Sequence, residues 1–305
     1  MKRIAGRTLY TLLVLFLASL AVFYAIRLSG GDATAARLVA SATAEDREAF
    51  RELLGLNEPI HQQYFTYMGR LLSGDLGVSL TNSSDIFKML TFHGRNSLIL
   101  GVTAFTLVFA VGIPLGILAA RKRNTWVDGA VMTFSIGGMA VPNFWLALLA
   151  IWLFASVWGL LPSAGCCSPR QLIMPAFVLA LEGIALTVRM TRSAMLENLE
   201  SDHVRTLRAG GLSEARVVNK HVLRASFIPI ISLMGLRIGQ IVGYALVVET
   251  IFGWPGLGQV LVNAVLRRDY PVAQFFSLVL VAIVVAGNWA ADIGYSLANP
   301  RLRKT

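Results

Sequence analysis

The segment 203–229, HVRTLRAGGLSEARVVNKHVLRASFIP, combines basic side chains with helical periodicity and lies between two long apolar runs. Apolar residues at helical spacing predict two short helices, 202–207 and 213–223, which the pair Gly210-Gly211 separates by a sharp break. A segment this polar between two membrane spans must lie at a membrane face. There it either rests on anionic lipid head groups or contacts a soluble partner.

Residues that could carry out catalysis or hold a metal are scarce. The sequence contains no H-E-x-x-H, no G-x-S-x-G and no phosphate-binding G-x-x-x-x-G-K-[ST]. The four histidines lie outside the apolar runs and show no ligand spacing. The adjacent Cys166 and Cys167 form no C-x-x-C pair, so a vicinal disulfide, a soft-metal contact and two free thiols all stay open. The sequence therefore predicts a protein without catalytic, cofactor-binding or metal-binding residues of its own.

Four polar or aromatic residues within or at the ends of the apolar runs are candidates for a functional site. Glu182 and Arg237 lie near the middles of two apolar runs, where a charge costs roughly 2.5–3.5 kcal/mol and must face protein or water. They are predicted to line the pathway or to form a structural ion pair. Glu249 and Trp254 follow at the end of an apolar run, as an outer gate or docking surface or as a plain helix-end anchor.

Small residues at helical spacing predict close helix packing. Gly235, Gly239 and Gly243 form a ridge four residues apart, which suits an interface with a second membrane chain, a pathway wall or packing within the chain. Gly112 and Gly116 flank Pro114, which predicts a kink and a close contact.

The elements that position these residues are membrane helices. The chain has 305 residues, is 55% hydrophobic and only 14% charged, and has a mean hydropathy of +0.64. Runs of about 18 or more apolar residues indicate membrane-spanning helices. Six segments qualify: 9–28, 97–120, 130–158, 172–190, 227–252 and 272–297. The predicted class is an all-α polytopic membrane protein, with Pro229 in the first turn of its fifth span and Ser213 as the cap of the helix before it.

Basic residues define the orientation. The net charge of +10 would suggest nucleic acid in a soluble chain, but here the positive charges cluster in alternate loops. The loops on the N-terminal side of the membrane are rich in Lys and Arg, and the short opposite loops are poor in them, which predicts both termini in the cytoplasm. A cleaved signal peptide ending near Ala33-Thr34-Ala35 is the alternative for the first span, but its apolar run is longer than such peptides need.

Four regions follow from this topology. We predict an N-terminal transmembrane helix at 1–28, an extracytoplasmic loop at 29–96, a five-helix core at 97–297 and a cytoplasmic tail at 298–305. The core contains the cytoplasmic loop 192–226. Within the outer loop, 44–54 and 64–72 are predicted helices and 74–77 is a predicted turn.

Several motifs in this order resemble the dipeptide/oligopeptide/nickel permease family of ABC importers. Arg205–Gly211 matches the family's R-T-A-R-A-K-G in the EAA loop, except that Leu207 replaces a small residue and Gly210 replaces lysine. Further matches occur along nearly the whole chain, at 54–64, 74–79, 221–229, 249–258, 268–272 and 299–303. Gly31-Asp32-Ala33 lacks the proline of the family's P-G-D-P.

The resemblance implies a type I ABC importer permease with a MetI-like core in the bacterial inner membrane. It implies that a coupling helix contacts the ATPase through Arg205, Thr206, Leu207, Arg208, Ala209, Gly210, Gly211 and Leu212. ATP and Mg²⁺ would be held by two partner ATPase subunits. A second permease and an extracytoplasmic binding protein would complete the importer, with peptides or nickel and other metal chelates as cargo. An ATP-independent channel or secondary transporter is the alternative, and an intramembrane enzyme is a remote third.

Overall fold

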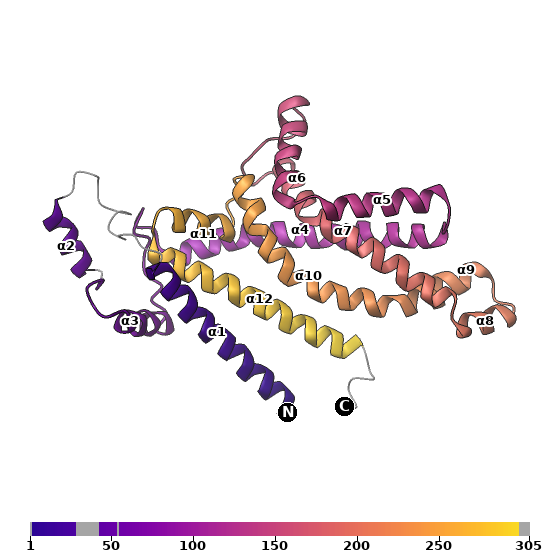
Figure 1. Cartoon of the computed structure of the whole chain (residues 1–305), viewed down its shortest axis with the longest axis horizontal. Helices are drawn as coiled ribbons and strands as arrows, with labels where there is room; N and C mark the ends of the chain where they lie inside the picture. Colours follow the sequence, from indigo (N-terminus) through magenta and orange to yellow (C-terminus); the bar gives the residue numbers. More distant parts are fainter. Residues whose placement is uncertain (1, 29–42, 54, 299–305) are drawn as a thin grey trace. The chain divides into compact units, whose positions relative to one another are not determined.

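The computed structural model describes residues 2–28, 43–53 and 55–298, without the side chains of 2–7, 9, 53, 228, 231–238 and 290–298. The described residues form helices, with turns and one isolated bridge between Val78 and Asp85. The helices are α1 (Lys2–Leu28), α2 (Ala44–Leu53), α3 (Ile60–Leu72), α4 (Ile86–Arg121), α5 (Trp126–Ala140), α6 (Asn143–Ala150), η2 (Ile151–Val157), α7 (Pro169–Leu199), α8 (Asp202–Ala209), α9 (Glu214–Arg216), η3 (Val217–Val222), α10 (Leu223–Ile251), α11 (Leu257–Leu266) and α12 (Tyr270–Ala298). Figure 1 traces them along the chain. The all-α prediction is confirmed.

The membrane-spanning helices agree with most of the predicted apolar runs. Four helices are long and apolar enough to cross a membrane: Tyr10–Leu28, Ile86–Arg121, Pro169–Leu199 and Tyr270–Trp289. A bent pair of helices would add a fifth span. Helix α10 coincides with the predicted run 227–252. The total of six spans and the orientation stay predictions.

The predicted span 130–158 is not one continuous helix. The chain breaks between α5 and α6, and the two halves are bent by 104°. Pro142 lacks an amide hydrogen and forces the residue before it out of the helical region, and Val141 accordingly has an extended conformation with ψ 121°. Hydropathy alone does not register this break, because both halves are apolar.

The predicted position of Pro229 is also wrong. Helix α10 begins at Leu223, so Pro229 lies inside the helix rather than in its first turn. The helices of the polar segment continue through the π-helical η3 directly into α10. Because the chain never leaves the helical conformation there, the proline removes one amide donor from an established helix instead of starting a new one.

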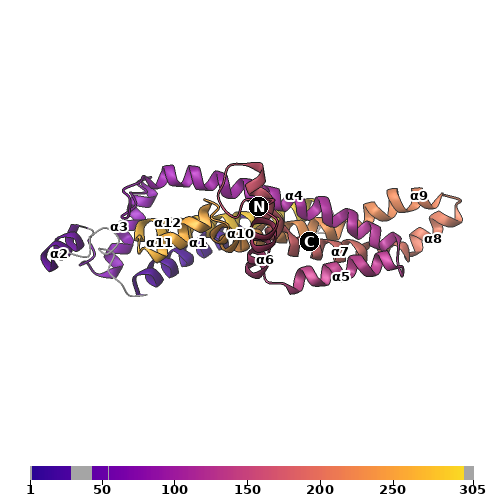
Figure 2. The same cartoon turned by 90° about the horizontal axis from the view of Figure 1, so that it is seen from above.

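The chain divides into two compact units, Met1–Leu98 with Trp254–Ile283, and Ile99–Gly253 with Val284–Thr305. In the second unit, α7 is the central helix. Of its apolar 18-residue stretch, 67% is buried, against 28% for the corresponding stretch of α4. Helix α7 packs against α5, α6 and α10. In both Figure 1 and Figure 2, α5 runs alongside α7.

Glycines bring α4 and α7 into close contact. A Cβ atom added to Gly112 would lie 2.7 Å from Cβ of Thr187, and one added to Gly116 would lie 2.6 Å from Cβ of Thr191. From the opposite side, a Cβ at Gly183 would lie 2.6 Å from a methyl carbon of Val108. The close contact predicted from Gly112 and Gly116 is confirmed, and it involves the backbone surfaces of both helices.

In the first unit, Asp269 joins two motifs that are far apart in the sequence. Its carboxylate is buried and accepts a hydrogen bond from Ser79 Oγ at 2.5 Å, across 190 residues of chain. The backbone amides of Leu80 and Thr81 donate to the same carboxylate at 3.1 and 3.2 Å. The motifs at 74–79 and 268–272 thus form one polar junction beside the apolar cluster of α11 and α12.

The N-terminal elements of this unit follow the sequence predictions. Helices α2 and α3 form near the predicted ranges, and Gly74 and Gly77 turn the chain with φ +84° and +76°. Tyr64 on α3 packs edge-to-face on Phe23 of α1 and shares a 2.7 Å hydrogen bond with Ser19. These contacts fix α3 against the end of α1.

We expect Gly116→Ala to lower the stability of the folded protein by about 1–3 kcal/mol, because the new methyl group overlaps α7. Its Cβ would also lie 2.8 Å from the carbonyl oxygen of Val188, which cannot rotate away. Thermal unfolding of the purified full-length protein in detergent measures the change. Gly137→Ala on α5 is the matched control, since nothing lies within 4 Å of the added carbon. Equal melting temperatures for both variants would contradict the close contact.

We expect Asp269→Asn to destabilise the first unit by about 1–3 kcal/mol, because an amide nitrogen replaces one accepting oxygen and faces a donor. Ser79→Ala removes a single donor to Asp269, so its effect should be smaller. Limited proteolysis of the segment 60–85 in the full-length protein tests this order. If Ser79→Ala is the more susceptible variant, the carboxylate is not the centre of the junction.

Candidate functional site

The polar segment forms a compact helical hairpin at the end of α7. Helix α8 ends at Ala209, Gly210 caps it, and Gly211 adopts the left-handed conformation with φ +79°. The Leu212 amide donates to the Leu207 carbonyl at 3.3 Å and the Gly211 amide donates to the Arg208 carbonyl at 3.0 Å. This pair of bonds is the Schellman motif, which satisfies the free carbonyls of a helix end. Figure 1 and Figure 2 both show α8 and α9 together beyond α7.

An ion pair closes the hairpin across the turn. Arg208 donates to both carboxylate oxygens of Glu214, from Nε at 2.9 Å and from Nη2 at 2.7 Å. The hydrogen bond from Arg208 lowers the pKa of Glu214, and the same bond raises the pKa of Arg208. Because the carboxyl pKa is lower in the folded hairpin, the ion pair stabilises the hairpin at every pH above the ordinary carboxyl pKa. This contribution is lost only as the pH falls through the lowered pKa. The pair is therefore ionised at neutral pH.

The interior of the hairpin is apolar. Val204, Val217 and Val222 are fully buried and pack with Met195 of α7 and Ala120 of α4. Leu207 and Leu212, the two residues joined by the longer Schellman hydrogen bond, both pack against this cluster. The hairpin thus packs on the adjoining ends of α4 and α7.

Polar contacts attach the same hairpin to the helices around it. Arg121 at the end of α4 donates to Asn219 of η3. Asn198 of α7 donates to Ser226 of α10 at 3.3 Å. Because α9, η3 and α10 follow one another without a loop, a displacement of the hairpin moves α10 directly and α7 through packing.

The hairpin exposes most of the predicted coupling residues on one surface. Six of them are exposed: Arg205, Thr206, Arg208, Ala209, Gly210 and Gly211. Leu207 and Leu212 are half-buried in the apolar interior. The predicted N-cap Ser213 stands at the start of α9, but its side chain makes no capping hydrogen bond. The arrangement presents a basic, backbone-rich turn to a partner.

Sequence reasoning missed an ion pair between α5 and α7. Arg192 donates to Asp128 from Nε at 2.6 Å and from Nη2 at 2.7 Å, and the Asp128 side chain is only 7% exposed. Asp128 also accepts the Asn124 amide at 3.1 Å, at the turn between α4 and α5. The lone acid at the start of an apolar run was the available signal. Its partner Arg192 lies 64 residues later, among the basic residues from which the membrane orientation was predicted, so the sequence did not single it out.

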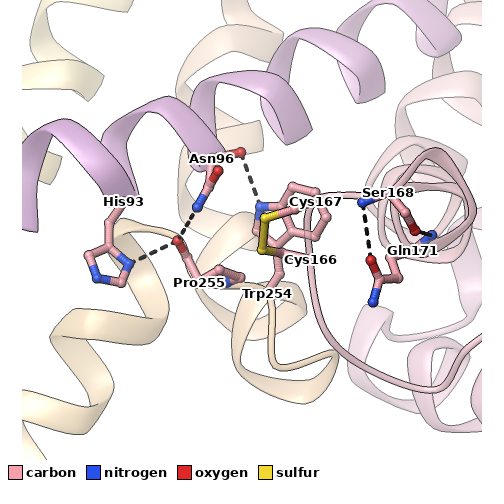
Figure 3. The surroundings of a disulfide bond; sticks show 8 residues. All are labelled: His93, Asn96, Cys166, Cys167, Ser168, Gln171, Trp254 and Pro255. Atoms are coloured by element: carbon pink, nitrogen blue, oxygen red, sulfur yellow. Dashed lines mark hydrogen bonds between the residues drawn. A yellow bond between two sulfur atoms is a disulfide. The ribbon is translucent and has the colours of Figure 1, made fainter.

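The predicted gate segment is a buried anchor in the first unit. Trp254 is 2% exposed and donates from Nε1 to the Asn96 carbonyl at 3.0 Å (Figure 3). The Pro255 carbonyl accepts from Asn96 Nδ2 at 3.1 Å and lies 2.9 Å from His93 Nδ1. This network ties the start of α4 to the segment before α11. The gating role stays a prediction.

The two cysteines form a vicinal disulfide immediately before α7. Ser168 and Gln171 then make a capping box, in which each side chain bonds the other residue's amide (Figure 3). The Gly165 amide donates to the Phe252 carbonyl at 3.1 Å, which joins this turn to the end of α10. Of the three open alternatives for Cys166 and Cys167, the structure therefore contains the disulfide.

The remaining candidates are only partly placed. Glu182 is half-buried on α7 and Glu249 is 1% exposed on α10. The side chain of Arg237 and the surroundings of Gly235 are not described, so the proposed pairing of Arg237 with Glu182 stays a prediction. A Cβ at Gly239 would lie 3.0 Å from Asn288 of α12, whereas Gly243 has nothing within 4 Å. Within the described part of the chain, no group of three or more His, Cys, Asp or Glu could hold a metal.

Comparisons with known proteins agree with this geometry. The model of the family "binding-protein-dependent transport system inner membrane component" matches residues 112–304. The chain is 40% identical to the di/tripeptide transport system permease protein DppB of Pseudomonas aeruginosa, over 82% of this chain and 83% of that protein. It is 34% identical to the oligopeptide permease AppB of Bacillus subtilis over 98% of both chains, and 36% identical to the glutathione permease GsiC of Escherichia coli over 95% and 94%.

Solved structures show the same fold. An inward-facing MetNI methionine ABC transporter contains a chain that matches 71% of this one and is itself matched over 99% of its length. The TM-score is 0.57 and the sequence identity 19%. The predicted MetI-like core is confirmed at the level of fold.

We expect Gly211→Ala to loosen the hairpin, because a left-handed conformation costs an L-residue roughly 1–2 kcal/mol. Gly210→Ala is the matched control, since its φ of −77° suits alanine and its new carbon would make only ordinary contacts. Hydrogen exchange of the α8 amides in the full-length protein should accelerate about 5–30-fold in Gly211→Ala alone. The same rate in both variants would show that the left-handed turn is not what holds the hairpin.

Proposed function

The chain belongs to the family of binding-protein-dependent transport system inner membrane components, and from this premise we propose that it conducts peptides as one half of a two-permease pathway. Its family makes it a multi-pass permease subunit of an ABC importer in the bacterial inner membrane, and not an enzyme. Partner ATPase subunits and a substrate-binding protein belong to that assembly. The second half of the pathway would be a related permease chain.

Peptide cargo is supported by the names of the relatives. The three permeases described above are named for di/tripeptides, oligopeptides and glutathione, and each aligns over most of this chain. None of these three is named for nickel. Of the two predicted cargoes, peptides and metal chelates, peptides are therefore better supported. The binding protein delivers the cargo, and this chain would select it less strictly.

The hairpin of α8 and α9 supports the coupling role most directly. Its exposed surface is basic and polar, while its interior packs on α4 and α7. A self-sufficient channel or secondary transporter has no use for such a surface. We propose that two ATPase subunits, which bind ATP and Mg²⁺, contact this surface, and that their closure displaces the hairpin as a rigid body.

Charge reversal at Arg208 tests the proposal. In Arg208→Glu, the acid faces Glu214 across the turn, so the hairpin should open while the spans still insert. We expect binding-protein-dependent peptide uptake in proteoliposomes to fall by about 5–150-fold, the range of a coupling free energy of 1–3 kcal/mol, while ATP hydrolysis continues.

The double variant Arg208→Glu/Glu214→Arg restores the ion pair with opposite polarity, and we expect it to recover most of the uptake. Lys122→Glu, an exposed basic residue outside the hairpin, is the matched control for a change of net charge. Normal uptake by Arg208→Glu would refute the coupling role. Failure of the double variant alone would assign Arg208 to direct contact with the ATPase.

A further inference from the structure

A polar cavity of about 450 Å³ lies in the first unit, between the end of α1, helix α3 and the start of α12. The predicted orientation places it where α1 leaves the membrane on the outer side. Its walls carry both arginines and carboxylates.

Three hydrogen-bond donors of this cavity are buried without a partner. They are Arg27 Nη1, the Tyr67 hydroxyl and Gln274 Nε2, and Gln274 is only 3% exposed. An unpaired buried donor costs roughly 1–3 kcal/mol, so three on one cavity point to an acceptor that binds there. Burial is the main cause that raises the pKa of Tyr67 to about 12, so its hydroxyl keeps its proton at neutral pH.

The arginine is held in place by its surroundings. Arg27 lies over the rings of Phe23 and Tyr270, with its guanidinium carbon 4.1 and 5.4 Å from their centres. Its Nε donates to Gln63 at 2.5 Å. These contacts leave Nη1 for a ligand, and a fixed guanidinium beside neutral donors suits a phosphate oxygen.

The opposite sign of charge occurs on the same cavity. Glu52, Glu58 and Asp75 line it together with a second arginine, Arg70. Their carboxylates suit a primary ammonium group, which donates hydrogen bonds, better than a trimethylammonium group, which cannot. The cavity therefore carries donors that suit a phosphate and acceptors that suit an ammonium group.

Helix α3 presents apolar side chains beside this polar cavity. Phe65 is 70% exposed and Leu72 is 82% exposed. Leu28, at the end of α1, is 72% exposed. An amphipathic helix with such residues lies in the membrane interface, where acyl chains would cover them. The ligand is therefore expected at the level of the lipid head groups.

We propose that this cavity binds the head group of an ethanolamine phospholipid, with its phosphate on Arg27, Tyr67 and Gln274 and its ammonium on the carboxylates. The lipid would fix α3 to the end of α1 and to the start of α12. Anionic phosphatidylglycerol fits less well, because the cavity carries three acids against two arginines.

Native mass spectrometry tests the proposal on the full-length chain, with the subunits that co-purify. The protein is taken from nanodiscs of equal phosphatidylethanolamine, phosphatidylcholine and phosphatidylglycerol and is delipidated in steps. We expect one phosphatidylethanolamine to remain on the wild type. Tyr67→Phe and Gln274→Met should each lower its occupancy about tenfold, the effect of one lost hydrogen bond to a charged group.

Tyr64→Phe is the matched control on the same helix. Its hydroxyl bonds Ser19 and does not line the cavity, so this variant should lose stability but keep the lipid. Wild-type retention by both Tyr67→Phe and Gln274→Met would overturn the proposal, as would equal losses in the two tyrosine variants. Displacement by soluble phosphoethanolamine as efficient as by the lipid would assign the site to a free phosphate compound instead.

Discussion

The close packing of α4 on α7 is the constraint on which the second unit depends. Helices in lipid gain nothing from hiding apolar surface from one another, so their association rests on packing and on polar contacts. Gly112 and Gly116 remove side chains from α4 where Thr187 and Thr191 of α7 lie, and Gly183 does the same for Val108. The interlocking fixes the register of the two helices, because a shift by one residue would place a side chain against backbone.

Helix α7, whose register against α4 is fixed in this way, makes further contacts at both of its ends. At one end, Met195 joins the apolar interior of the hairpin of α8 and α9, and Arg192 holds Asp128 of α5. At the other end, Ser168 caps the helix, and Gly165 bonds back to the end of α10. A force applied at the hairpin is therefore carried by a helix that cannot slide along its neighbour.

Local patterns predicted local structure well. The features predicted correctly depend on residues within a few positions of one another. They are helices α2 and α3, the turn at Gly74 and Gly77, and the break at Gly210-Gly211. The close approach at Gly112 and Gly116 was also predictable, because a small residue every fourth position has few other uses in a membrane helix. What the pattern did not contain was the identity of the partner helix.

The failures have two physical causes. At Val141-Pro142 and at Pro229, the same residue type breaks one helix and is accommodated in another, and the outcome depends on tertiary packing rather than on proline itself. The pairs Asp128–Arg192 and Asp269–Ser79 join positions 64 and 190 residues apart, and a single sequence does not state which polar residues meet. Charge placement revealed that these residues existed, but their roles required the fold.

The departures of the hairpin from its family pattern now have distinct consequences. Leu207 packs against the apolar interior of the hairpin, and its carbonyl accepts the Leu212 amide in the Schellman turn, so its side chain contributes to the packing of the hairpin itself. Gly210 is exposed at the helix end, where the family carries a lysine, so its effect is to remove one positive charge from the contact surface. In the proposed contact with an ATPase, a hairpin that lacks this positive charge would rely more on shape and less on electrostatic attraction. Its coupling should accordingly depend less on ionic strength than that of a relative with the lysine, because screening acts on exposed charges and not on packed ones.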